Sequence, residues 1–251
     1  MKKLLAMCSV VVILAVAACK SGGSTGGGDG GNGGGGCSGG GCNPMADIML
    51  KQYTDGTQKA MYAVALHADA KAGQFWVTKT VSDFGGAKSE STDKWQVGAV
   101  TPDGVVVENF NGAYGIVLAY LVDASVSKED MWKKGNVKKA WAGKPGEAGT
   151  EIKVMEVPAP ADTTGPAPEK NYTDKTEDFK DVEIAGGKWS GKMYWLKMND
   201  GSVETSTWTA DNGWFNGLVK MESKMAAGTM TMTLEKFGEG FEKDGKAWLK
   251  W

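Results

Sequence analysis

The sequence contains no arginine and only one histidine, His67, among its 251 residues. Arginine is the usual side chain for bidentate binding of phosphate, carboxylate and guanine, and the formal net charge of the chain is −2. We therefore expect no nucleic-acid partner. The lysine pairs Lys133-Lys134 and Lys138-Lys139 are interpreted as a solvated surface rather than a phosphate-binding groove.

Recognisable catalytic motifs are also absent. The sequence has no Gly-x-Ser-x-Gly element and no Walker-type phosphate loop. No nucleophilic or acidic residue has a sequence spacing that indicates a catalytic role with His67. We interpret His67 as a histidine at the edge of a packed helix. The carboxylates of Glu177 and Asp178 lie in a stretch rich in Lys, Asp and Thr that is typical of a solvated loop. We expect a non-catalytic protein without a cofactor.

The first residues have the pattern of a secretory signal peptide. Lys2 and Lys3 precede an apolar run over residues 4–16, and the small residues Ala17 and Ala18 lead into Cys19. The apolar run is shorter than the ~20 residues that a transmembrane helix needs. The sequence therefore predicts a signal peptide over residues 1–18.

The residues Leu14-Ala15-Val16-Ala17-Ala18-Cys19 resemble the lipobox of bacterial lipoproteins. This resemblance implies that Cys19 becomes the N-terminus and carries a thioether-linked diacylglycerol and an N-acyl chain such as palmitate. It also implies an outer-membrane destination in a Gram-negative cell, because Lys20 replaces the aspartate associated with retention at the inner membrane. Whether the protein faces the periplasm or the cell surface stays open.

Residues 19–42 are predicted to be a lipidated cysteine followed by a disordered, glycine-rich tether, since they contain no side chain that can bury itself in a core. Cys37 and Cys42 are the cysteines that remain, and outside the cytoplasm a local disulfide between them is favoured. Intermolecular pairing is an alternative. A metal site is disfavoured, because zinc needs three or four ligands and His67 is the one other soft ligand.

Residues 43–157 are predicted to form helix followed by antiparallel strands. Asn43-Pro44 is typical of a helix start, and a second helix is expected over residues 58–70 from its apolar spacing. A short helix is expected from Ser125 or Ser127 to Lys134. Alternating and apolar runs then predict strands, among them residues 75–81, 89–100, 105–107, 115–122 and 151–157.

Residues 158–171 are predicted to be a proline-rich connector, and residues 172–251 an antiparallel meander that shares one sheet with residues 43–157. The turn sequence Asn199-Asp200-Gly201 follows an alternating run over 188–198. Thr229 to Leu234 alternate strictly between hydroxyl and apolar side chains. The expected fold class is mainly β (α+β), a twisted antiparallel sheet or half-barrel with one or two N-terminal helices packed on one face.

This architecture resembles the half-barrel of periplasmic lipoprotein carriers, and the segment from Trp214 to Glu222 is similar to one that recurs in uncharacterised bacterial lipoproteins. The arginine that is prominent in the carriers has no counterpart in this chain. An unclosed sheet leaves an apolar groove, and methionine adapts such surfaces to varied ligands. We expect Trp189, Trp195, Trp208 and Trp214 near that groove.

The function expected from these observations is binding of an apolar ligand or lipid by a membrane-anchored envelope lipoprotein. A structural or protein-interaction module of the envelope is the first alternative, and a surface glycan-binding protein is the second. The expected partners are the membrane through the lipid anchor, and a hydrophobic ligand or an envelope protein.

Overall fold

The computed structural model describes residues 44–67, 69–159, 170–242 and 245–251. The predicted signal peptide, the lipidated Cys19, the tether with Cys37 and Cys42, and most of the proline-rich connector lie outside the described residues. All described helices and strands belong to one compact unit, Cys42–Trp251. This unit contains both hydrophobic clusters of the described residues, and we therefore expect it to fold without residues 1–41.

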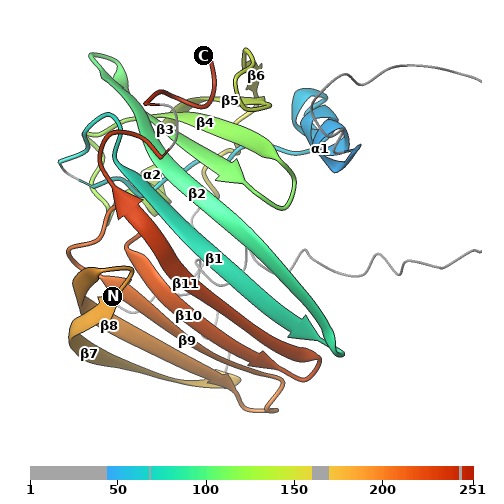
Figure 1. Ribbon diagram of the computed structural model, residues 1–251, viewed down its shortest axis with the longest axis vertical. Helices are drawn as coiled ribbons and strands as arrows, with labels where there is room; N and C mark the ends of the chain where they lie inside the picture. Colours follow the sequence, from blue (N-terminus) through green and yellow to red (C-terminus); the bar gives the residue numbers. More distant parts are fainter. Residues whose placement is uncertain (1–43, 68, 160–169, 243–244) are drawn as a thin grey trace, which may run out of the picture. The chain divides into compact units, whose positions relative to one another are not determined.

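The described residues form one antiparallel sheet of 11 strands that does not close into a barrel, with two helices. Figure 1 shows the sheet and its long hairpins. The elements are α1 (Pro44–Thr54), β1 (Phe75–Phe84), β2 (Ala87–Thr101), β3 (Gly104–Asn111), β4 (Ile116–Val122), α2 (Met131–Lys134), β5 (Val137–Gly143), β6 (Thr150–Ile152), β7 (Tyr172–Ile184), β8 (Gly187–Met198), β9 (Val203–Ala210), β10 (Leu218–Met225) and β11 (Gly228–Gly238). The expected mainly β, antiparallel and unclosed fold is confirmed.

The strand order is β6-β5-β4-β3-β2-β1-β11-β10-β9-β8-β7. Strands β1 to β6 form one meander and β7 to β11 form a second, and the pairing of β1 with β11 joins the two. Strand β7 is one edge of the sheet and carries many charged side chains. Charged edges discourage pairing with other chains.

The expected first helix is present as α1, but the second, over residues 58–70, is wrong. The described residues of that segment have no helical turn, and the segment makes a parallel bridge to the chain after β6 instead. The Ala60 amide donates to the carbonyl of Lys153, and the side chain of Asn136 bonds both backbone groups of Val64. A short apolar run is compatible with a helix or with a buried extended segment. These tertiary hydrogen bonds stabilise the extended conformation.

Two strands occupy segments that the sequence suggested were solvated. Strand β5 includes Lys138 and Lys139, and the edge strand β7 includes Glu177 and Asp178, so the expected loop at these carboxylates is wrong. Both segments expose their charged side chains, which is why composition alone indicated a loop. The predicted strand over 151–157 is shorter in the structure, where β6 ends at Ile152.

In the first meander, the main hydrophobic cluster lies on one side of the sheet, which we call the inner face. Residues opposite each other in an antiparallel ladder share a face, and the inner face carries Tyr120, Val107 and Val97 in β4, β3 and β2. Side chains of α1 and of segment 60–66 pack against this cluster, among them Met49, Leu50 and Met61. On the outer face of β3 and β4, a second cluster of Val106, Val117 and Ala119 is completed by Leu249 and Trp248 of the C-terminal segment.

Candidate functional site

The inner face continues from the core into the second meander, where its character changes. The ladder carries it from Val97 along β2 to Asp93, and across to Thr78 in β1. One row of opposing side chains then crosses seven strands: Ser91, Thr80, Met232, Met221, Thr207, Tyr194 and Thr176. The next row is Ser89, Ser82, Met230, Ser223, Thr205, Leu196 and Asp174.

Most apolar side chains of these rows are only partly buried. Met230, Met232 and Leu196 of these rows are intermediate in exposure, as are Met225 and Val203 of the next row, while Met221 is buried. In the first meander, by contrast, Val107 and Tyr120 of the same face are 0% and 1% exposed. The second half of the inner face is therefore an incompletely covered apolar surface, which we call the methionine face.

The hydroxyl groups of the methionine face bond one another across the strands. Thr205 and Ser223 are joined by a hydroxyl hydrogen bond of 3.0 Å, and Ser82 and Ser89 by one of 2.7 Å. The Thr78 hydroxyl donates to the carbonyl of Asp93. The Thr205–Ser223 pair is buried, and a buried hydroxyl with a partner avoids the cost of an unsatisfied polar group. These residues therefore add methyl and methylene surface to the face without demanding a polar ligand.

The four tryptophans expected near a groove lie in two different environments. Trp189 is 4% exposed, and its ring lies 5.1 Å from that of Trp76 and 4.9 Å from that of Phe237. Trp214 also packs on Phe237, at 6.1 Å. These two tryptophans belong to an aromatic cluster of the core.

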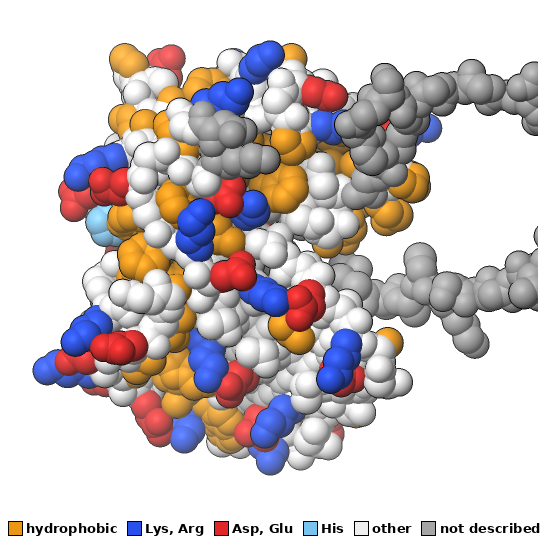
Figure 2. Space-filling model, in the orientation of Figure 1, with side chains coloured by type: hydrophobic (Ala, Val, Ile, Leu, Met, Phe, Trp, Pro, Cys, Tyr) orange, Lys and Arg blue, Asp and Glu red, His pale blue; other side chains and the backbone are white. Residues whose placement is uncertain are grey.

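By the alternation along β8 and β9, Trp195 and Trp208 point to the face opposite to the methionine face, and Trp208 also packs against the main hydrophobic cluster. Trp208 is paired with Lys220, whose ammonium lies 4.9 Å from the centre of the indole ring. The Trp195 indole donates to Glu204, and Lys175 lies over its ring at 5.6 Å. Figure 2 shows basic and acidic side chains interspersed on one face of the molecule, with hydrophobic side chains between them.

A carboxyl group lies where the covered and uncovered parts of the inner face meet. Asp93 accepts hydrogen bonds from the Trp95 indole at 2.9 Å and from the Asn109 amide at 3.0 Å. Burial raises the pKa of Asp93 to about 6, although both hydrogen bonds act to lower it. Trp95 in turn stacks on Tyr120, and burial raises the pKa of that phenol. Sequence reasoning missed Asp93, because it follows a run of exposed polar residues.

The other candidate residues do not assemble into a catalytic or metal-binding group. His67 follows the extended segment, and its Nδ1 atom accepts a hydrogen bond from the Asp69 amide. Glu177 pairs with Lys175, and Asp178 pairs with Lys192 on the neighbouring strand. Among the residues that the structure describes, no cluster of three His, Cys, Asp or Glu side chains could hold a metal ion.

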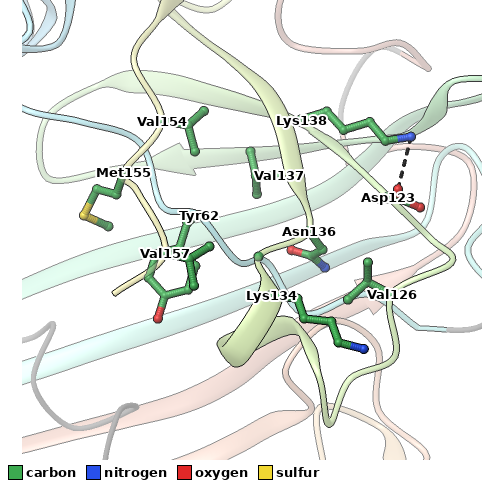
Figure 3. Close-up of a pocket in the computed structure, with 11 residues that line it drawn as sticks. Tyr62, Asp123, Val126, Lys134, Asn136, Val137, Lys138, Val154, Met155 and Val157 are labelled. Carbon is green, nitrogen blue, oxygen red and sulfur yellow. Dashed lines mark ion pairs between the residues drawn. The ribbon is translucent and has the colours of Figure 1, made fainter. Parts of the chain in front are cut away.

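A depression lies between α2, β5 and the chain that follows β6. Its volume is about 180 Å³, and its lining includes Tyr62, Asn136, Val137, Val154 and Lys138. Figure 3 shows the ion pair between Lys138 and Asp123 at its margin. Lys134 and Lys138, which the sequence assigned to a solvated surface, both border this depression.

None of the helices in the described part of the chain is long and apolar enough to cross a membrane. No protein-family model and no curated protein sequence matches this chain. Among solved structures, a DUF1329 family protein from Desulfovibrio piger is similar over 78% of this chain and 91% of its own, with 7% identity and a TM-score of 0.30. A Vibrio parahaemolyticus domain described as a "putative outer membrane lipoprotein-sorting protein domain" is similar over 69% of this chain and 88% of its own, with 10% identity and a TM-score of 0.26.

Proposed function

We propose that this protein is a non-catalytic envelope lipoprotein that binds the acyl chain of a lipid or lipidated protein on its methionine face. The observation that carries the proposal is the partial exposure of Met225, Met230 and Met232 on a face whose other half is buried core. Methionine is flexible and polarisable, so it can repack around ligands of varied shape. An acyl chain offers flexible apolar surface and needs no directional partner.

The polar groups of the methionine face are compatible with such a ligand. The hydroxyl groups of Thr205 and Ser223, and those of Ser82 and Ser89, bond each other. An acyl chain that covers them would therefore not leave these hydroxyl groups without hydrogen-bond partners. Asp174 and Lys170 pair at 3.1 Å at the β7 margin. A polar head group would find charged partners there while its chain lies on the methionines.

Lipidation of Cys19 and processing of residues 1–18 are part of the same proposal. A diacylglycerol together with an N-acyl chain gives stable membrane anchoring, where a single chain would be marginal. A glycine-rich tether over residues 19–42 would let the folded unit reach ligands in the surrounding envelope. The proposed location is the outer membrane.

Binding of a fluorescent fatty acid to residues 42–251 tests the proposal. The substitutions Met230→Lys and Met232→Lys each place a charge on the methionine face. The matched controls Thr229→Lys and Thr231→Lys place a charge on the outer face of the same strand. We expect saturable binding by the unsubstituted protein, loss of roughly tenfold or more in affinity for the Met230→Lys and Met232→Lys variants, and little change for the threonine variants.

Two results would count against the acyl-chain site. One is the absence of saturable binding by the unsubstituted protein, which would favour the envelope-interaction alternative. The other is equal loss of affinity in the methionine and threonine variants at unchanged thermal midpoints, which would move the binding surface away from the methionine face.

A further inference from the structure

A second depression lies next to the one beside α2, along the β5–β6 end of the sheet. The second has a volume of about 550 Å³ and shares Lys138 and Val154 with the first. Its lining includes Lys139 and Lys153. We call the two together the basic groove. It lies in the first meander, away from the methionine face, and is independent of the proposed acyl-chain site.

The basic groove has an excess of positive charge that the composition of the chain does not explain. Lys134, Lys138, Lys139 and Lys153 line it, against the two carboxylates Asp123 and Glu151, while the chain as a whole has a net charge of −2. Lys138 pairs with Asp123 at 3.3 Å and Lys134 with Asp130 at 2.9 Å. Within the described ranges, no carboxylate lies within ion-pair distance of Lys139 or Lys153, and both side chains are exposed.

Exposed apolar side chains lie in the first depression, which shares Lys138 with the second. Met155 is 40% exposed and Val157 is 37% exposed, and both line the first depression together with the half-buried Val137 and Val154. Figure 3 shows Met155 and Val154 on the side of the depression away from Lys134, and Val157 beside Tyr62. Ammonium groups next to exposed apolar groups are the combination that binds the interface of an anionic bilayer.

The groove is held in shape by buried contacts. Asn136 is 5% exposed and bonds the amide and carbonyl of Val64 at 2.8 Å each. Gly135 has a φ of +72°, and a Cβ there would lie 2.9 Å from the Val157 side chain and 3.2 Å from the Tyr62 carbonyl. Asn136 therefore fixes the start of β5 to segment 60–66, which itself bridges to Val154 after β6, and little ordering is needed on binding.

We propose that the basic groove is a docking site for the anionic phospholipid head groups of a membrane surface, with Lys139 and Lys153 bound to phosphate and Met155 and Val157 inserted among the head groups. The unpaired ammonium groups complement the phosphate charge, and the exposed apolar side chains favour a lipid over a soluble anion. Such a contact would hold the folded unit against the bilayer in one orientation, without the lipid anchor.

Vesicle binding by residues 42–251, which lack Cys19, separates this contact from anchoring. The vesicles are phosphatidylcholine alone, or phosphatidylcholine with phosphatidylglycerol at three tenths of the lipid. We expect binding to the anionic vesicles only, weakened by raising the salt concentration. The Lys139→Glu/Lys153→Glu variant should bind roughly tenfold more weakly or worse. The control Lys88→Glu/Lys224→Glu makes the same charge change on β2 and β10 and should bind within about twofold of the unsubstituted protein.

Met155→Ser/Val157→Ser should weaken binding while leaving its salt dependence unchanged, and all variants should keep the thermal midpoint of the unsubstituted protein. Equal binding to both kinds of vesicle, no binding to either, or equal losses in the groove and control variants would overturn the proposal. Competition by millimolar inorganic phosphate would also overturn it, because the groove would then be a site for a soluble anion. None of these results depends on fatty-acid binding at the methionine face.

Discussion

The carboxylate of Glu108, in the middle of β3, binds the indole of Trp251, the last residue of the chain, at 3.1 Å. The same carboxylate accepts hydrogen bonds from the backbone amides of Trp248 and Leu249 at 2.8 and 2.9 Å, and from Gln96 at 2.6 Å. Glu108 is 0% exposed. One buried acid thus fixes the C-terminal segment over the outer hydrophobic cluster, where Leu249 is buried.

Glu108→Gln should destabilise the folded unit, because an amide cannot accept all four hydrogen bonds and its own NH₂ group would face other donors. Buried donors left without partners cost about 1–3 kcal/mol each, so we expect a loss of about 2–4 kcal/mol in the free energy of unfolding. Urea denaturation measures it. The control Glu222→Gln removes an exposed partner of Lys220 and should change stability by less than about 1 kcal/mol. Equal stability of the Glu108 variant and the unsubstituted protein would show that the carboxylate does not hold the segment.

Asp93 should make stability depend on pH. Its pKa is raised to about 6 in the folded protein from an ordinary value of 3.8, so the folded state holds the proton more tightly than the unfolded chain. The stabilisation is fully present below about pH 4 and is lost as the pH rises through about 6. The change is on the order of 2–3 kcal/mol.

Asp93→Asn should remove that part of the pH dependence. The measurement is the free energy of unfolding in urea at pH 4.5, 5.5 and 7, compared between variant and unsubstituted protein. Asp123→Asn is the control, because the pKa of that half-buried carboxyl is lowered by Ser125 and Lys138 and its effect lies at lower pH. If the Asp93 variant keeps the full slope between pH 4.5 and 7, another group causes it.

Trp189 and Trp208 should differ in their contribution to stability. Trp189→Ala leaves a cavity among Trp76 and Phe237 and should cost about 3–5 kcal/mol. Trp208 is only half-buried, at the margin of the main cluster and under Lys220, and Trp208→Ala should cost clearly less. Chemical denaturation compares them, and fatty-acid affinity should be unchanged by Trp208→Ala. A larger loss for Trp208 would reverse the assignment of core and surface.

Cys19→Ser should abolish acylation, because the thiol is the proposed acceptor of the lipid. Metabolic labelling with a fatty-acid probe measures it, with Cys37→Ser as the matched control that should label normally. Equal labelling of the Cys19 variant and the unsubstituted protein would rule out the lipoprotein assignment.

Deletion of residues 22–41 should leave the thermal midpoint of unfolding unchanged, since all described elements and both hydrophobic clusters lie in the unit Cys42–Trp251. Differential scanning calorimetry of the two proteins checks this. A fall of more than a few degrees would mean that the glycine-rich segment contributes packing to the folded unit.

The fold class and many strands could be predicted from the sequence, because their signals are local. The alternation from Thr229 to Leu234 requires one hydroxyl face and one apolar face, and the turn at Asn199-Asp200-Gly201 joins β8 to β9 as expected. Pro44 begins α1 as predicted. In each case, neighbouring residues in the sequence determine the structure.

Tertiary contacts decided the remainder. Residues 58–67 are extended because Lys153 and Asn136 form hydrogen bonds with their backbone. Hydrogen-bond partners so far along the chain cannot be predicted from the local sequence. The pairing of β1 with β11 determines that Met232 shares a face with the buried core while Trp208 lies on the opposite one. The sequence by itself determined which strands have an apolar side, because side chains alternate with period two. Only the tertiary structure decided which of those sides is covered, because burial depends on elements that are distant in the sequence.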